Sequence, residues 1–205
     1  MHSLTRRTLT AAALALAAGA AFGSATVGQP APAFTATDTS GKTVSLADFK
    51  GKHVVLEWVN PGCPYVVKHY GSGNMQGTQR EAMGKGVVWL SVNSTATDAS
   101  DYRKPADMAA WMQQQKATPT ATLMDADGTV GRAFGARTTP HMYIIDPAGK
   151  LVYAGAIDSI PSPRPADIAN ATNHVKVALG ELLAGKPVST PVTRPYGCSV
   201  KYSSM

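Results

Sequence analysis

The sequence predicts an α/β fold in which helices cover both faces of a mixed central sheet. Two apolar runs, at residues 54–59 and 86–92, have the length and composition of buried strands. Helical patterns follow each run, and a hairpin and a last helix come after them. This alternation of strands and helices is typical of layered α/β domains. A hydrophobic content of 44% is sufficient for an ordinary packed core.

The first 25 residues have the layout of an export signal. Arg6 and Arg7 precede an apolar run at residues 9–22, and small residues at 23–25 suit a signal peptidase. The two arginines resemble those of a twin-arginine signal, which would carry a folded protein across the membrane. An ordinary Sec signal is an equal alternative, and an uncleaved anchor is a third. We therefore expect a periplasmic or secreted protein.

Charge and hydropathy restrict the partners of the mature chain. Removing residues 1–25 would lower the formal net charge from +6 to +4, and the basic residues are dispersed. No block of Lys and Arg indicates a nucleic-acid partner. No later segment approaches the length of about 20 apolar residues that a transmembrane helix needs. We expect no stable membrane association once the signal is removed.

The first half of the mature chain predicts two short strands and then a buried strand followed by a helix. Residues 38–41 form a turn between the short strands, and residues 46–49 form one helical turn. The strand at 54–59 is apolar except for Glu57. A helix begins near Pro64, where proline is tolerated, and runs into the 80s. Glycines weaken this helix and predict a break at residues 71–74.

The second half predicts a helix that begins at Pro105, a strand at 122–124 and a helix at 129–134. Strands at 141–145 and 151–156 form a hairpin. The final helix is marked by apolar residues at core spacing, namely Ile168, Val175, Leu179, Leu182 and Leu183. Residues 188–205 are predicted to be a tail.

Cys63 is the candidate nucleophile because it lies between a buried strand and a helix. Unpaired N–H groups and the helix dipole at a helix N-terminus stabilise a thiolate and lower the pKa of such a cysteine. The charge of Lys68 could add to this effect if the side chain folds back. The alternative is a buried, inert cysteine.

Cys198, on the tail, is the second of the two cysteines. In an oxidising compartment, an even number of cysteines permits one disulfide. A bridge between Cys63 and Cys198 would close a long loop and contribute about 4–5 kcal/mol in the chain-entropy model.

Several motifs in sequence order resemble the redoxin group, which contains alkyl hydroperoxide reductase-like peroxidases and exported thioredoxin-like reductases. These motifs are found at residues 28–34, 38–42, 46–52, 54–59, 63–65, 138–140 and 146–149. The resemblance covers residues 27–185, most of the mature chain, and implies a thioredoxin-like domain at 26–187. The tail at 188–205 follows this domain.

The resemblance also implies roles for residues around Cys63. Thr139-Pro140 would be a cis peptide packed against the thiol, offering backbone groups to a bound thiol partner. Asn60 and Tyr65, which flank the cysteine, are further candidates for substrate binding. Glu57 would pass protons to and from the thiol, with a pKa raised by burial. The alternative is that Glu57 pairs with a lysine such as Lys52 or Lys85.

Two departures from the family patterns limit this inference. Val66 occupies the position where a thioredoxin has its second cysteine. A peroxiredoxin has Thr or Ser where this chain has Asn60, and Pro where it has Leu56. Asn60 could donate a hydrogen bond in place of the missing hydroxyl. Cys198 is therefore the candidate resolving thiol. Alternatively, it is a permanent structural staple or lies too far from Cys63.

The leading hypothesis is an exported thiol oxidoreductase that acts on protein disulfides or peroxides and is reset by an external reductant. We expect no cofactor and no metal ion. One alternative is a copper(I) carrier, although Val67 replaces its second cysteine. An improvised copper site would use Cys63, His69, His141 and Met142. His141 follows Pro140 and could face the thiol, but we expect it to be solvent-facing or satisfied by another partner. The other alternative is a protein-binding module in which Cys63 has no chemical role.

Overall fold

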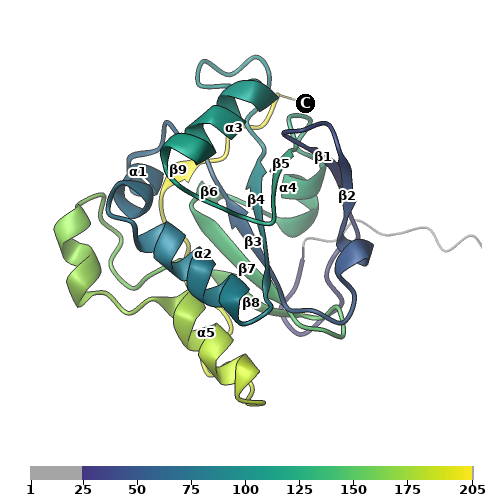
Figure 1. The fold of residues 1–205 in the computed structure, drawn as a ribbon, viewed down its shortest axis with the longest axis vertical. Helices are drawn as coiled ribbons and strands as arrows, with labels where there is room; N and C mark the ends of the chain where they lie inside the picture. Colours follow the sequence, from purple (N-terminus) through teal and green to yellow (C-terminus); the bar gives the residue numbers. More distant parts are fainter. Residues whose placement is uncertain (1–24, 205) are drawn as a thin grey trace, which may run out of the picture.

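A seven-stranded mixed sheet runs through residues 25–204, the part of the chain that the computed structural model describes (Figure 1). The strand order is β2-β1-β5-β4-β3-β7-β8. β3, β4 and β5 are parallel, whereas β7 runs antiparallel to β3 and β1 antiparallel to β5. The strands are β1 Thr35–Asp38, β2 Thr43–Ser45, β3 Val54–Trp58, β4 Val88–Asn93, β5 Ala121–Met124, β7 His141–Ile145 and β8 Leu151–Gly155. The predicted α/β fold is confirmed.

Helices cover both faces of the sheet, as the sequence predicted. Side chains of α1, α2, α3 and α5 pack in one core, and side chains of α4 pack in the other. The helices are α1 Pro64–Gly71, α2 Asn74–Gly84, α3 Pro105–Gln114, α4 Thr129–Phe134 and α5 His174–Leu183. Two short 3-10 helices, η1 Leu46–Phe49 and η2 Pro165–Asn170, complete the set within residues 25–204.

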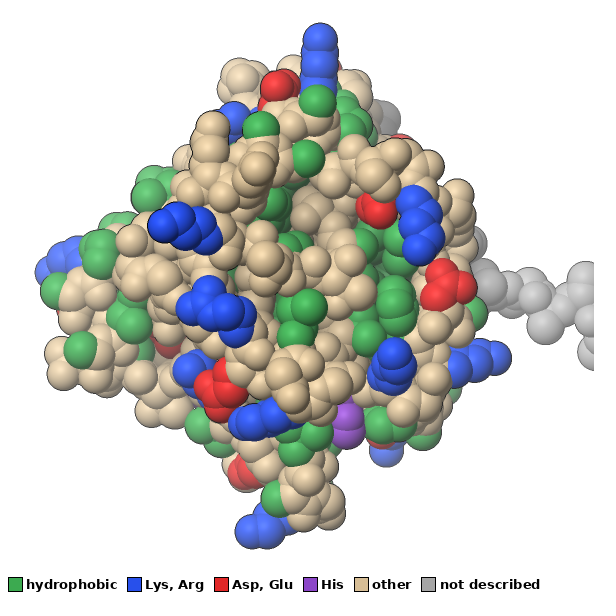
Figure 2. All heavy atoms as spheres, viewed as in Figure 1, with side chains coloured by type: hydrophobic (Ala, Val, Ile, Leu, Met, Phe, Trp, Pro, Cys, Tyr) green, Lys and Arg blue, Asp and Glu red, His purple; other side chains and the backbone are tan. Residues whose placement is uncertain are grey.

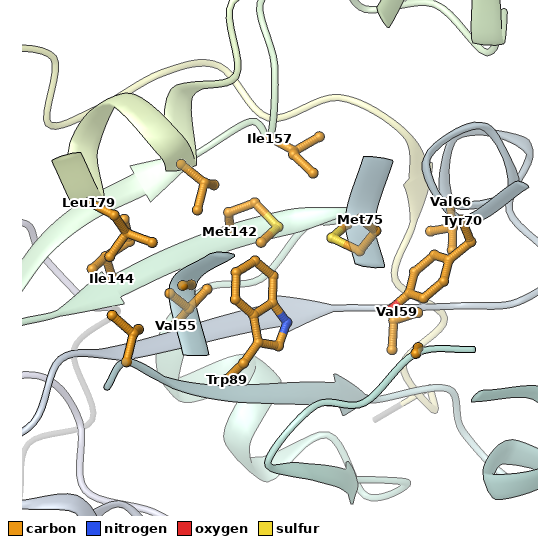
Figure 3. Close-up of a cluster of buried hydrophobic side chains, with 14 of the residues drawn as sticks. Val55, Val59, Val66, Tyr70, Met75, Trp89, Met142, Ile144, Ile157 and Leu179 are labelled. Carbon is orange, nitrogen blue, oxygen red and sulfur yellow. The ribbon is translucent and has the colours of Figure 1, made fainter. Parts of the chain in front are cut away.

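β3 separates the two cores because its side chains alternate between the faces of the sheet. Val55 packs with Trp89 and Met142 beneath α1, α2 and α5, and Figure 3 shows these side chains converging. Trp58 lies on the opposite face and packs against Phe134 of α4. All five residues of β3 are buried. The strand therefore leads directly into the buried turn that contains Cys63.

The predicted break in the first long helix is confirmed. α1 ends at Gly71 and α2 begins at Asn74. Gly73 lies between them with φ +75°, in the left-handed region that glycine adopts at little cost. The break allows α1 and α2 to pack against the same core at different angles.

One part of the predicted last helix is wrong. Ile168 belongs to η2, and α5 begins only at His174. The Asn173 side chain accepts a hydrogen bond from the backbone N–H of Lys176, so it caps a new helix. The chain therefore leaves one helical segment before it enters the next.

The tail returns along the body of the protein. It hydrogen bonds first to β8 through Ala154, whose N–H donates to Pro191 O at 3.0 Å. Further along, β9, Cys198–Ser199, pairs antiparallel with β6, Thr138–Thr139, beside α1 (Figure 1). Lys201 O then accepts from Ala96 N at 2.8 Å. The tail thus places a strand over the start of α1.

The surface bears on two expectations from the sequence, namely that basic residues are dispersed and that the mature chain has no transmembrane helix. Lys and Arg side chains are scattered over the face shown in Figure 2, with acidic side chains among them. Within residues 25–204, no helix is long and apolar enough to cross a bilayer. The predicted export signal lies outside the described residues except for Ala25.

Candidate active site

Cys63 occupies the N-cap position of α1, where the loop after β3 becomes a helix. Its φ of −84° and ψ of 122° are extended, and Pro64 begins the helix. The Cys63 N–H donates to Asn60 O at 3.0 Å, and the Cys63 carbonyl accepts from Val67 N at 2.9 Å. The residue is only 1% exposed. A tight turn therefore fixes the thiol at the helix N-terminus, as predicted, but beneath other residues.

The Asn60 side chain shapes this turn. Its carbonyl oxygen accepts from Gly62 N at 2.8 Å, and its amide donates to Asp101 Oδ2 at 2.8 Å. The amide therefore has a carboxylate acceptor in the loop that contains Asp101. The hydrogen bond that we expected Asn60 to offer a substrate would require this contact to open.

The Thr139-Pro140 peptide is cis, as the resemblance implied. Thr139 and Cys63 are in contact, because the Cys63 thiol donates to Thr139 O at 2.9 Å. Both Thr139 and Pro140 are buried. The loop thus presents a backbone carbonyl to the thiol.

Cys198 lies beside Cys63, so the reading in which the tail is too distant is wrong. Pairing of β9 with β6 sets Cys198 opposite Thr139. The Cys198 N–H lies 3.4 Å from Cys63 Sγ and donates to it. Both cysteines are free thiols. The backbone donor at the sulfur thus comes from the tail strand, whereas the sequence had suggested the first turn of α1.

Gly197 permits this close approach. Its φ is +137°, and a Cβ on this residue would lie 2.0 Å from Thr139 O. No other residue type fits that space without moving β9 or β6. The sequence Gly197-Cys198 is therefore suited to bringing a cysteine against the cis-proline loop.

The Cys198 thiol holds its proton tightly. Partial burial raises its pKa to about 12, and the hydrogen bond and charge of the neighbouring Cys63 act in the same direction. A thiol with such a pKa is a poor first nucleophile near neutral pH. The environment of Cys198 therefore disfavours its thiolate.

Glu57 is fully buried on the face of β3 that α1 and α2 cover. Its carboxylate accepts hydrogen bonds from four neutral side chains, which together with it form the Glu57 cluster. These donors are Tyr70 Oη at 2.7 Å, Trp89 Nε1 at 2.8 Å, Ser91 Oγ at 3.1 Å and Gln79 Nε2 at 3.2 Å. Burial raises the pKa of Glu57, and the four hydrogen bonds oppose that shift only in part.

The lysine alternatives for Glu57 are wrong. Lys85 pairs with Glu81 at 3.0 Å on the surface, and Lys52 is exposed. The carboxylate of Glu57 has no solvent-accessible surface through which either lysine could reach it. The charge of Glu57 is therefore met by hydrogen bonds alone.

Lys68 does not assist the Cys63 thiolate, so that prediction is wrong. Its Nζ is buried and lies 3.1 Å from Asp158 Oδ2 and 3.2 Å from Ile160 O. The side chain points from α1 toward the segment after β8. The pairing is physically reasonable, because a buried ammonium needs an opposite charge and several acceptors.

Tyr65 and the histidines have other contacts. The Tyr65 ring packs edge-on against Tyr196 of the tail, 5.7 Å between centroids. His141 lies on the other face of the sheet, and its Nδ1 accepts from Tyr143 Oη at 3.1 Å and Arg137 N at 3.3 Å. Burial lowers the pKa of His141 to about 3. His141 is therefore a satisfied core histidine.

His69 is engaged with Asn74 Nδ2 at 2.8 Å and Tyr196 Oη at 3.2 Å. The two histidines of the improvised copper site are thus each hydrogen bonded elsewhere. Across residues 25–204, no group of three or more His, Cys, Asp or Glu side chains is placed to hold a metal ion.

Sequence reasoning missed a second buried polar group next to the thiols. We call Lys68, His69, Asp158 and Tyr196 the Asp158 cluster. Asp158 accepts from Lys68 and, in a very short hydrogen bond, from Tyr196 Oη. Two features of the sequence could have indicated this cluster. The carboxylate of Asp158 directly follows the apolar residues 156–157, and Lys68 lies within an otherwise apolar helix turn.

Comparison with known proteins places the chain in a family. The family model described as "AhpC/TSA family" matches residues 27–154, which include β3, Cys63 and the cis-proline loop. The chain belongs to the AhpC/TSA family. This confirms the resemblance to redoxins, and the fold agrees with it.

Individual relatives are distant. The thiol-disulfide oxidoreductase ResA of Bacillus thuringiensis subsp. konkukian is 27% identical over 126 residues, or 62% of this chain and 67% of that protein. A putative peroxiredoxin bcp of Coxiella burnetii is 31% identical over 110 residues, or 53% of this chain and 66% of that protein. An uncharacterized conserved protein from Geobacillus kaustophilus superposes with a TM-score of 0.74 and 27% identity, covering 88% of this chain and 94% of its own.

Proposed function

We propose that this AhpC/TSA protein is an exported thiol oxidoreductase whose Cys63 and Cys198 cycle between a dithiol and a disulfide. The observation that carries the proposal is the β6–β9 pairing, which sets the Cys198 N–H 3.4 Å from Cys63 Sγ. Cys63 has no CxxC partner at Val66, so the tail supplies the second thiol. The export signal rests on residues 1–25 of the sequence.

The proposed cycle reduces a disulfide substrate. The Cys63 thiolate attacks one sulfur of the substrate, forming a mixed disulfide and releasing the other sulfur as a thiolate. The Cys198 thiol then loses its proton and attacks Cys63 Sγ. This releases the second substrate sulfur and leaves a Cys63–Cys198 disulfide. Two electrons pass from the protein to the substrate, and an external dithiol returns them.

Disulfide exchange is favoured over peroxide reduction by the groups around Cys63 Sγ. Within residues 25–204 the sulfur contacts Thr139 O, Cys198 N and the Cys198 thiol. None of these is the Thr or Ser hydroxyl of a peroxiredoxin, and the Asn60 amide is bound to Asp101. The ResA relative is named for the same reaction class.

Peroxide reduction is the second candidate, and the burial of Cys63 favours it. At 1% exposure beneath β9, the thiol admits only a small oxidant while the tail is docked. Hydrogen peroxide would convert Cys63 to a sulfenic acid with release of water, and Cys198 would displace a second water to form the same disulfide. The relative named as a peroxiredoxin belongs to this branch.

Glu57 is the proposed proton-exchanging group. It lies on the face of β3 shared with α1, and its raised pKa brings it closer to the working pH of a thiol enzyme. Thr139, Pro140 and Tyr65 form the proposed contact surface for a partner, together with Asn60.

The test is thiol counting and peptide mapping of the purified mature protein. The reduced protein is treated in parallel with one equivalent of glutathione disulfide or of hydrogen peroxide, beside Cys63→Ser and Cys198→Ser variants. We expect a Cys63–Cys198 disulfide that glutathione disulfide forms and a dithiol reopens. Rapid formation with peroxide alone would favour the second candidate. A Cys63 thiol that stays free in both arms would refute the function.

A further inference from the structure

One member of the Asp158 cluster, Tyr196, belongs to the tail and lies two residues before Cys198 in the sequence. We propose that Tyr196 is a positioning residue whose hydroxyl, held by Asp158 and His69, fixes β9 so that Cys198 lies against Cys63. This inference rests on the proposed function, because it concerns how the resolving thiol reaches the nucleophile. It assigns a role that the cycle itself does not use to three buried side chains and the half-buried Tyr196.

The hydrogen bonds of the cluster have a single consistent direction. Asn74 Nδ2 donates to His69 Nδ1 at 2.8 Å, which leaves the proton of the neutral ring on Nε2. His69 Nε2 then donates to Tyr196 Oη at 3.2 Å, and Tyr196 Oη donates to Asp158 Oδ1. Burial lowers the pKa of His69 to about 4, which keeps the ring neutral at pH 7. The Tyr196 hydroxyl thus has one donor and one acceptor.

The charge of Asp158 is balanced within the cluster. Lys68 Nζ lies 3.1 Å from Asp158 Oδ2, and both side chains are buried. The same ammonium lies 5.6 Å from the centre of the Tyr196 ring, within cation–π range. A buried ion pair is weak evidence for stability, since desolvation offsets most of the attraction. The best-attested use of a buried ion pair is to specify which segments pack together. Here the pair specifies where Tyr196 of the tail binds.

The position of Tyr196 is passed to Cys198 by a short, constrained segment. The Tyr196 ring packs 5.7 Å from Tyr65, which follows Cys63 closely in α1. Gly197 then presses against Thr139 O, and Cys198 enters the pairing with β6. Tyr196 and Cys198 are the two ends of this segment, and contacts hold both of them. Release of the Tyr196 hydroxyl frees one end, so β9 can then move away from Cys63.

The measurable consequence is a change in the disulfide equilibrium. Reduced protein and one glutathione disulfide exchange to give the Cys63–Cys198 disulfide and two glutathione molecules. The oxidised protein is always docked and therefore loses the full stabilisation of the Tyr196 hydroxyl when it is removed, whereas the reduced protein can release the tail and loses less. Loss of the hydroxyl therefore favours the reduced state and lowers the equilibrium constant.

The experiment titrates wild type, Tyr196→Phe and Tyr202→Phe with glutathione buffers. Tyr196→Phe keeps the ring and its contacts, and Asp158 Oδ1 still accepts from Ile160 N at 3.1 Å. Tyr202→Phe is the matched control, because that tail hydroxyl donates to the neutral Ala136 carbonyl at 2.8 Å, beyond β9. We expect about a tenfold lower constant for Tyr196→Phe, the size of one hydrogen bond to a charged acceptor. The control should stay within twofold of wild type.

The thermal midpoint of each reduced variant separates positioning from general destabilisation. Should Tyr196→Phe be unfolded, His69→Met, which has no N–H to donate, takes its place with the same sign of change. A folded Tyr196→Phe within twofold of wild type would overturn the positioning role and leave the proposed function intact. A wild type that forms no Cys63–Cys198 disulfide would overturn both.

Discussion

Glu57 and Asp158 are both buried carboxylates on the side of the sheet that α1 covers, yet their surroundings differ. The Glu57 carboxylate accepts hydrogen bonds from four neutral side chains on β4, α1 and α2. Asp158 is met by a lysine from α1 and a tyrosine from the tail. The Glu57 cluster is therefore internal to the domain, whereas the Asp158 cluster joins the domain to the segment that carries Cys198.

The comparison shows that two buried acids can serve different purposes in one site. Without a counter-charge, Glu57 has its pKa raised by burial, which suits the proton exchange proposed for it. Asp158 is paired with Lys68 and accepts from Tyr196, so it is suited to hold the tail. Variants at the two positions should therefore have different consequences for the tail.

The largest expected effect comes from breaking the ion pair. Asp158→Ala leaves Lys68 buried without a counter-charge, which should lower the free energy of unfolding by about 3–5 kcal/mol. It also frees the half-buried Tyr196, so chymotrypsin should cleave the folded, reduced variant faster after Tyr196. Urea denaturation and mass spectrometry of timed digests measure the two effects.

Glu57→Ala is the matched control for that experiment. It removes a buried carboxylate of the other cluster and destabilises the protein by leaving donors unpaired. Cleavage by chymotrypsin after Tyr196 should remain at the wild-type rate under conditions in which both variants are folded. Equal acceleration in the two variants would contradict the assignment of the tail to Asp158 alone.

The next largest effect is expected from a variant that prevents docking of the tail but leaves the side chains of both clusters unchanged. Gly197→Ala places a Cβ at 2.0 Å from Thr139 O and forces β9 away from β6. The yield of Cys63–Cys198 disulfide with glutathione disulfide should fall more than tenfold while the domain stays folded. Gly180→Ala, on an open face of α5 with no atom within 4 Å, is the control and should equal wild type. An unchanged yield in Gly197→Ala would show that β9 pairing is not needed.

The smallest effect concerns the pH dependence of stability and isolates the Glu57 cluster. A carboxyl whose pKa is raised in the folded state contributes stability at low pH, and this is lost as the pH rises through the folded pKa. Wild type should therefore lose stability relative to Glu57→Gln as the pH increases from about 4.5, the unfolded value. Urea denaturation at a series of pH values measures the difference. A constant difference across the series would mean that Glu57 does not titrate as described.

Much of the fold follows from local sequence. The apolar run before Cys63, the prolines that begin α1 and α3, and the glycine break before α2 are short-range signals that place these elements. Ile168 was misassigned because its spacing fits the apolar pattern of α5, whereas the cap at Asn173 decides where the helix begins. Periodicity alone cannot separate two helical segments that share a hydrophobic face.

The site was predictable where it depends on motif order and not where it depends on distant pairing. Cys63 and the cis Thr139-Pro140 peptide follow from motifs, and their contact is observed. The docking of Cys198 depends on contacts between segments far apart in the chain, as does the pairing of Lys68 with Asp158. Such long-range contacts leave no local pattern, which is why Lys68 was assigned to the wrong partner.

The large separation of Cys198 from Cys63 in the sequence has a consequence for biosynthesis. Cys198 follows Cys63 by 135 residues, so the ribosome adds the strands and helices around Cys63 before it adds the partner strand β9. During this interval the cis-proline loop and the Cys63 thiol lack the cover of the tail. A chain that crosses the membrane unfolded from its N-terminus would expose Cys63 to the oxidising side first, whereas export after folding would deliver the two thiols already paired.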